Sequence, residues 1–392
     1  MPFLNGSLGF ERFRVTGTKI KNFSQDHIEA LEKNASSNLS KSLKSEAGVV
    51  GFSGGDHIFD TDFAEEKNII GDALHFAVRI DTNQVPSAIR KAWLTMELAA
   101  LTRENATRRP TKAQREEAKE AVEARCEAEL ETGKYRKTQH YPLLWDARRQ
   151  ILYVAASGDS VVGHCTEIFE SAFEVELERI SAGKLACEWG QDSGNEEAID
   201  LLAPTSFISE NQAGELTWAN PHSVAPDFIG NEFLMWLWWH LESESETLTL
   251  ADETEITAML TKTLSLECPY GENGKETIAA ESPVVLAEAR QAIASGKLPR
   301  KTGMTLVRQG QQFDLVLQAE TFAVSGAKIH LDEGDDPYDL EARIESIRSL
   351  SEGIDLLLHR FCEIRVSKKW NKELKKIQNW IGGFLSARQA AA

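Results

Sequence analysis

Three side chains near residue 60 have the chemistry and spacing of a metal-binding group. His57, Asp60 and Asp62 lie close together in the sequence, and clustered carboxylates hold the ion of metal-dependent nucleases. Alternate residues in this spacing would share one face of a strand. The chain has 61 acidic residues, however, so chance clusters are expected, and a solvated strand edge explains the same pattern. A metal-dependent nuclease is therefore kept as an alternative hypothesis.

The sequence lacks the usual signatures of other enzymes. It contains no phosphate-binding P-loop, no GxSxG nucleophile elbow and no HExxH zinc motif. The remaining candidate bases, His140, His164 and His240, are isolated in the sequence, which is typical of hydrogen-bonded structural histidines. We therefore expect a protein without a cofactor, a bound metal or enzymatic activity.

Basic residues are more informative because they form clusters against a net charge of -18. Such clusters attract duplex DNA, since neutralising its phosphates releases condensed counterions. Taken singly, any one cluster is more often an ordinary solvated surface. No zinc finger or base-reading helix is evident, so any binding should be directed at phosphates. The predicted DNA contacts are Arg108, Arg109 and Lys112; Lys297, Arg300, Lys301 and Arg308; and Lys368, Lys369, Lys372, Lys375 and Lys376.

The elements that position the first cluster can be read from periodicity. Residues 74–81 alternate as a strand with one buried face, and Pro86 then opens a helix. Residues 103–112 form a basic break before a very polar helix over 113–130, and two strands follow within 143–155. The break therefore lies between two helices, where side chains can project.

The remaining patterns predict antiparallel hairpins and helices. Strands at 305–308 and 313–317 flank a short reversal, and residues 337–385 are almost entirely helical. Residues 228–241 are apolar on all sides and contain three tryptophans, which predicts a buried helix or a subunit interface rather than a base-stacking surface. The absence of repeating βαβ units favours an α+β fold with antiparallel sheets and packed helices.

Composition indicates a cytoplasmic protein. Hydrophobic residues make up 42% of the chain, as in ordinary globular proteins. The five cysteines are scattered and no signal peptide is evident, so we expect reduced thiols and neither secretion nor a membrane span.

Several stretches resemble, in the same order, the RdgC family of recombination-associated proteins. Residues 10–15 look like its opening strand, residues 76–86 like its strand-to-proline transition, and residues 144–157 like a later strand pair. Residues 232–239 are similar to a tryptophan helix of longer members, and residues 296–301 to the start of its late strands. The resemblance spans roughly residues 10–329 as short local matches. The helical segment after Pro337 and the expanded stretch 183–226 have no counterpart in shorter members.

The resemblance implies a non-enzymatic homodimer that closes as a ring around duplex DNA and restrains a RecA-type recombinase. By position, Lys297 and Lys301 match lysines near the central hole. Tyr135, Arg136 and Lys137 match the tip of an arm that contacts the other subunit. The expected location is the nucleoid. A third hypothesis is a protein-interaction module without DNA binding, in which the tryptophan helix and the C-terminal segment bind partners.

Together these patterns predict five segments. They are an N-terminal α+β lobe from residues 1–82 and 140–182, a projecting helical arm over 83–139, an irregular connection over 183–226, a second α+β lobe over 227–335, and a helical C-terminal extension over 336–392.

Overall fold

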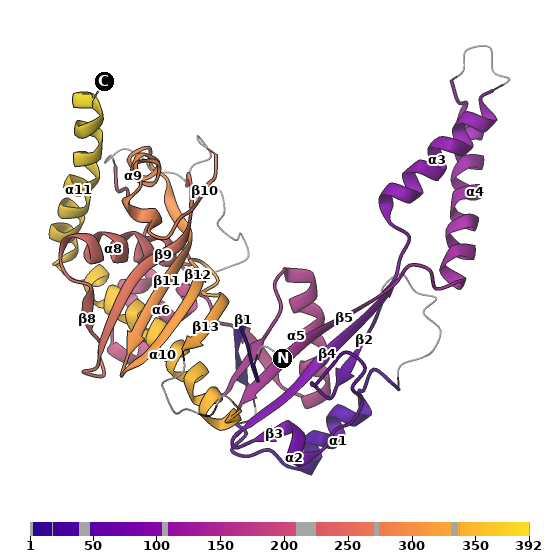
Figure 1. Ribbon diagram of the computed structural model, residues 1–392, viewed down its shortest axis with the longest axis horizontal. Helices are drawn as coiled ribbons and strands as arrows, with labels where there is room; N and C mark the ends of the chain where they lie inside the picture. The colour runs from indigo at the N-terminus through magenta and orange to yellow at the C-terminus, as the bar shows by residue number, and fades with distance from the viewer. Residues whose placement is uncertain are drawn as a thin grey trace.

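The fold is α+β, as predicted, with the strands joined in one antiparallel path (Figure 1). The computed structural model describes residues 3–17, 19–38, 48–103, 109–208, 225–269, 274–330, 336 and 338–391. Neighbouring strands follow the order β10-β9-β11-β12-β13-β1-β6-β5-β4-β2, with β3, β7 and β8 pairing off this path. Figure 1 shows two lobes and a projecting helical hairpin.

In the N-terminal lobe, two helices cover one face of the sheet. The rings of Trp145 and Phe169 pack edge to face with their centres 4.9 Å apart, and the Phe76 ring stacks on Phe169. These aromatic rings form a core between the sheet, α1 and α5. The elements are β1 (Leu8–Thr16), α1 (Gln25–Lys33), β2 (Val49–Ser53), α2 (Glu65–Asn68), β3 (Ile69–Ile70), β4 (Ala73–Asn83), β5 (Arg136–Asp146), β6 (Ile151–Val154), α5 (Asp159–Phe173) and β7 (Glu176–Arg179).

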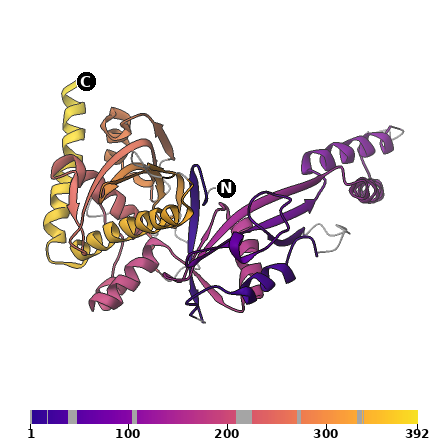
Figure 2. The same cartoon turned by 60° about the horizontal axis from the view of Figure 1, so that its bottom comes forward.

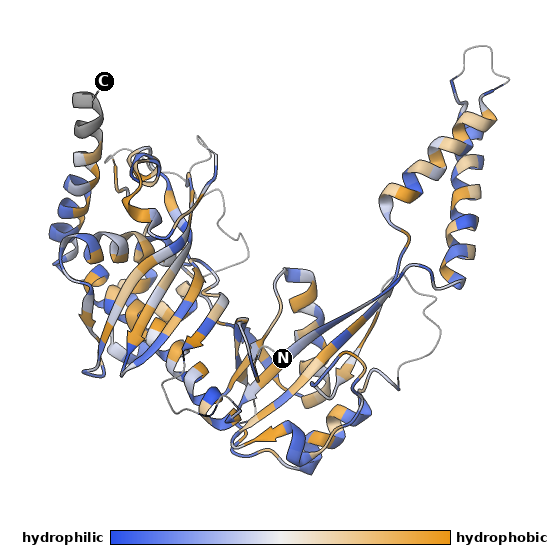
Figure 3. Cartoon of the chain, in the orientation of Figure 1, coloured by the Kyte–Doolittle hydropathy of each residue, from blue (hydrophilic) through white to orange (hydrophobic). Residues whose placement is uncertain are grey.

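The arm is a hairpin of α3 (Ser87–Leu101) and α4 (Lys112–Glu131) that extends the β4–β5 ladder. Thr111 begins α4 with a capping box to Gln114. The helices share a small core around Trp93, over which the Arg125 guanidinium lies 4.4 Å from the ring centre. In Figure 3, hydrophobic colour predominates on α3, whereas hydrophilic residues recur along α4. The arm is thus a thin two-helix element with a polar outer helix.

The second lobe places its helices around a larger core. Trp236, Trp238 and Trp239 of α8 are nearly inaccessible to solvent, which agrees with the predicted buried helix. The elements are α6 (Ala182–Ser193), α7 (Glu196–Asp200), α8 (Ile229–Ser243), β8 (Thr247–Thr249), β9 (Glu255–Glu267), β10 (Glu276–Ala279), the 3-10 helix η1 (Pro283–Val285), α9 (Ala287–Ala294), β11 (Leu298–Arg308), β12 (Gln311–Gln318), β13 (Val324–His330), α10 (Leu340–Val366) and α11 (Trp370–Ala391).

Two elements join the lobes. The first part of β1 pairs with β13, through Leu8 and Ala327, and its later residues pair with β6. Figure 2 shows α10 running along the second lobe toward β1. From α10, Asp355 binds Arg12 at 2.7 Å and Arg348 binds Asp146 at 2.7 Å. Because Phe361 and its neighbours on α10 are buried with α8, the expected C-terminal extension is an integral part of the second lobe.

Part of the predicted irregular connection is helical, which corrects the expectation for residues 183–200. The glycines suggested turns, but Gly183 and Gly190 lie inside α6. A Cβ at Gly183 would stand 2.7 Å from the Asp227 backbone nitrogen, and one at Gly190 would stand 3.0 Å from Ile199. These glycines therefore allow close packing of a helix. Residues 209–224 of the predicted connection lie outside the described residues.

Candidate nucleic-acid interface

Three of the four basic residues predicted around β11 are held in ion pairs. Lys297 is buried and binds Glu276. Arg308, with a side chain 4% exposed, lies between Asp252 at 2.5 Å and Glu352 at 2.9 Å. Arg300 contacts Glu267 and Glu320. These three side chains are structural in this conformation and are not available to phosphates; only Lys301 is exposed.

Lys301 belongs to a larger cationic surface, which we call the β9–β13 face. The ladder β11–β12 pairs Lys301 with Gln318 and Thr305 with Asp314 without a register shift, and Asp314 pairs with Lys328 of β13. Paired residues project to the same side of a sheet. The opposite side, with residues such as Leu315, packs into the core. The β9–β13 face is defined by Lys262, Lys301, Lys328, His330 and Asp314.

One carboxylate organises this face. Asp314 accepts hydrogen bonds from Lys262 Nζ at 2.6 Å and from Thr305 Oγ1 at 2.7 Å, and His330 Nε2 lies 3.3 Å away. Partial burial alone would raise the pKa of Asp314, but these contacts, with Lys262 foremost, lower it to about 2. Asp314 is therefore ionised at neutral pH, and its negative charge is paired with Lys262 and lies opposite Lys328 in the β12–β13 ladder.

Several neutral side chains near these charges can form hydrogen bonds. Thr257, Gln312, Gln318 and Ser325 are exposed or half-buried on β9, β12 and β13. Lys301 and Thr305 are four residues apart on β11, which corresponds to about 13 Å along the strand. The β9–β13 face is thus a broad polar surface rather than an enclosed pocket.

The arm carries a second set of cations near its tip. Arg109 and Lys112 are exposed beside the start of α4, and so are Arg103 and Arg115. Arg108, which was also predicted as a DNA contact, lies outside the described residues. The cations predicted around β11 and those predicted at the break between α3 and α4 are therefore on different parts of the molecule.

The predicted arm tip, Tyr135–Lys137, is instead at the base of the arm. The β4–β5 ladder extends to the pair Asn83–Arg136, so the chain has already rejoined the sheet at this point. Arg136 and Lys137 are exposed, and Tyr135 is half-buried in the arm's small core. The end of α3 and the start of α4 lie at the far end of the arm from the sheet (Figure 1).

The C-terminal lysines lie at the other end of the molecule, at the start of α11 (Figure 1). Lys376 is held between Glu244 at 2.8 Å and Glu373 at 3.4 Å. The other four are exposed, and no described carboxylate lies within 4 Å of them. They are Lys368, Lys369, Lys372 and Lys375.

The residues of the nuclease hypothesis form hydrogen bonds that hold one loop together. Asp60 is buried. Its carboxylate accepts hydrogen bonds from Lys67 Nζ at 2.5 Å and from the Asp56 and Asp62 amides at 2.9 and 3.1 Å. Burial would raise the pKa of Asp60, but these donors lower it. His57 accepts the Phe59 amide. Within the part of the chain that the structure describes, no group of three or more His, Cys, Asp or Glu residues is arranged to hold a metal ion.

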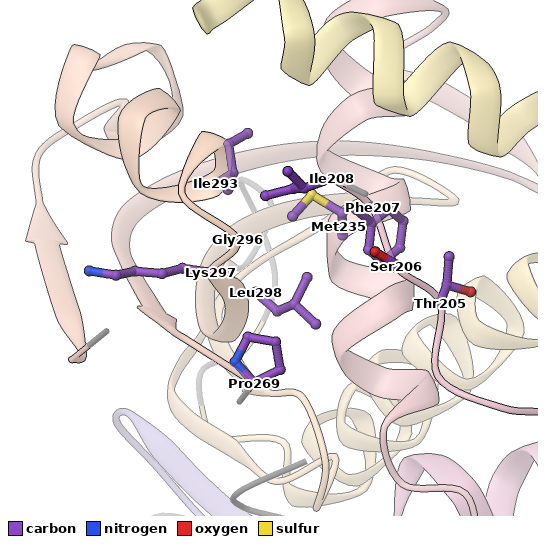
Figure 4. A pocket seen from close by; sticks show the side chains of 10 residues that line it. All are labelled: Thr205, Ser206, Phe207, Ile208, Met235, Pro269, Ile293, Gly296, Lys297 and Leu298. Carbon is purple, nitrogen blue, oxygen red and sulfur yellow. The ribbon is translucent and has the colours of Figure 1, made fainter. Parts of the chain in front are cut away.

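One small recess in the second lobe lies beside Lys297 (Figure 4). Its walls come from residues 205–208, Met235 and residues 296–298, and the side chain of Lys297 extends away from it. The interior volume of about 10 Å³ holds at most about one water molecule. This space is too small for an organic substrate.

Sequence reasoning missed Lys262, Lys328 and His330. Each is separated from other basic residues in the sequence, so no cluster marked it. The signal is their outward position on strands, which becomes a common surface only when the strand order and register are known.

Along the described helices, none is long and apolar enough to span a membrane. No protein-family model matches this chain, and the search of curated proteins found no match.

Proposed function

We propose that this protein binds duplex DNA without sequence specificity, with the β9–β13 face as its principal contact. The observation that carries the proposal is the convergence of Lys262, Lys301 and Lys328 from three strands on one accessible face in a chain of charge -18. Lysines neutralise phosphates as mobile point charges, and the surrounding threonine and glutamine side chains add hydrogen bonds to the backbone. The net negative charge of the chain disfavours DNA binding outside its cationic regions.

The proposal includes a non-enzymatic homodimer. Met96 is 62% exposed on α3, and the arm has only a small core of its own. A projecting hairpin with little core of its own is a shape that can reach a second copy of the chain. The resemblance to the RdgC family adds the further proposals of a ring around DNA, restraint of a RecA-type recombinase and association with the nucleoid. The exposed cations at the arm tip would extend the DNA contact.

Replacing Lys301 and Lys328 together by glutamate is expected to weaken duplex binding strongly. Each lost phosphate contact lowers the slope of log affinity against log salt by about one, so the double variant should lower it by about two. Fluorescence anisotropy with duplexes of unrelated sequence at several salt concentrations measures this slope. Lys33→Glu, which changes an exposed lysine of α1, is the control. Undetectable binding by the wild type at low salt, or equal slopes for the wild type and the double variant, would refute the proposal.

The Asp314→Asn variant should change affinity in the opposite direction. Asparagine removes the one carboxylate among the residues that define the β9–β13 face and releases Lys262 from its ion pair. Duplex affinity at low salt should rise by about tenfold or less, because one exposed ion pair contributes little energy. The same anisotropy titration measures the effect. A decrease in affinity, with the fold intact, would indicate that DNA does not contact this face.

A further inference from the structure

The outer surface of α4 carries a line of acidic side chains, which we call the α4 acidic stripe. Glu117, Glu120, Glu127 and Glu131 are all exposed. Their spacing places them on one side of the helix, opposite Ala118, Val122 and Cys126, which are buried against α3. No described cation lies within 4 Å of these four carboxylates. The stripe extends about 21 Å along the helix.

The outer surface of α11 carries the opposite charge. Lys372 and Lys375 are three residues apart on α11 and lie on the side of the helix opposite Ile377 and Ile381, which are buried in the second lobe. Lys368 is exposed in the turn just before α11. We call these three lysines the α11 lysine stripe. On the other side of the helix, Trp380 packs edge to face on Trp238 at a distance of 5.6 Å between ring centres. This packing anchors α11 and directs the stripe outward.

The two stripes cannot meet within one chain. Figure 1 shows α11 at one end of the molecule and the arm at the other. Each stripe is therefore an exposed line of like charges, and no described residue of the same chain provides its counterpart. A second copy of the chain provides both counterparts at once.

We infer that the α4 acidic stripe of one subunit docks against the α11 lysine stripe of a second subunit. A two-fold axis repeats the contact, so each dimer contains two such helix pairs, and the two open ends of the subunits are joined. This inference rests on the homodimer of the proposed function and not on DNA binding. It gives the lysines of α11 a role in subunit contact instead of the DNA contact predicted for them.

Charge reversal provides a sharp test in the absence of DNA. Lys372→Glu with Lys375→Glu reverses the lysine stripe, and Glu120→Lys with Glu127→Lys reverses the acidic stripe. Each double variant alone would bring like charges together at both contacts, so its dimer Kd should rise by at least about tenfold. An equimolar mixture of the two variants should recover the dimer, because opposite charges then meet at both contacts. Sedimentation velocity at low salt measures the mass of each species.

The control is Lys21→Glu with Lys33→Glu, which makes the same charge change on exposed residues of the N-terminal lobe and should leave the dimer intact. A wild-type monomer, normal dimers in either stripe variant, equal weakening by the control, or no recovery in the mixture would each overturn the inference. A symmetric contact of arm with arm predicts no loss in either variant alone. Failure of DNA binding would leave this result unaffected, so the two proposals are separately testable.

Discussion

Replacing Arg348 by methionine is expected to lower the free energy of unfolding by about 3–5 kcal/mol. The Arg348 guanidinium binds both carboxylate oxygens of Asp146, at 2.7 and 2.8 Å, and also contacts Asp72 and Glu345. Arg348 is 3% exposed and Asp146 is fully buried. Methionine retains much of the side-chain volume but leaves the buried Asp146 carboxylate without its cation. An unpaired buried charge is the most costly consequence of breaking such a pair.

The effect should also change how the lobes are coupled, because Arg348 is on α10 and Asp146 is at the end of β5. Urea unfolding followed by tryptophan fluorescence measures the total loss, and separate transitions for the two lobes would appear as a broadened curve. Arg360→Met is the matched control on the same helix. Its partner is Glu363 on the surface, so its cost should stay below about 1 kcal/mol. Equal costs for the two variants would contradict a special role for the Arg348 cluster.

Truncating Trp236 to alanine should cost about 3–5 kcal/mol of unfolding free energy. Trp236 is 1% exposed, and its ring centre lies 5.5 Å from that of Phe361 on α10. The change would leave a cavity between α8 and α10, at the centre of the second lobe. Thermal unfolding by calorimetry measures the loss, with Met259→Ala, which alters a side chain 53% exposed on β9, as the control with little effect.

This variant also distinguishes the two roles considered for the tryptophan helix. A core residue affects DNA binding only through stability, so folded Trp236→Ala protein at low temperature should keep the duplex affinity of the wild type. Unchanged stability with a large loss of affinity would instead indicate that the indole stacks on bases, contrary to its burial in the structure.

Elements with regular periodicity could be predicted well from the sequence. The helix expected over 113–130 is α4, Lys112–Glu131, because its polar face and capping residues act locally. The strand expected at 143–146 is only the end of β5, which begins at Arg136. Its first half is polar and is held as a strand by pairing with β4, a partner that local sequence does not reveal.

The residues of the candidate site were even harder to predict, because pairing between strands decides which side chains share a surface. Lys297 and Arg308 are close to Lys301 in sequence, but strand geometry and local carboxylates remove them from the accessible face. Lys262 and Lys328 are distant in sequence and join Lys301 through the sheet register. Clusters of charge in the sequence therefore pointed to the lobe that carries the β9–β13 face, but not to most of the side chains that form this face.

The strand β1 has a consequence for how the protein is made. Leu8 leaves the ribosome long before its partner Ala327 in β13, because the two residues are far apart in the sequence. The N-terminal part of β1 therefore has an unpaired edge until β13 has been synthesised. Pairings between residues so distant in sequence also form slowly. During translation this edge is exposed to misassembly with other chains. Full-length protein should therefore depend on chaperones more than its individual lobes would suggest, and truncation before β13 should leave a product prone to aggregation.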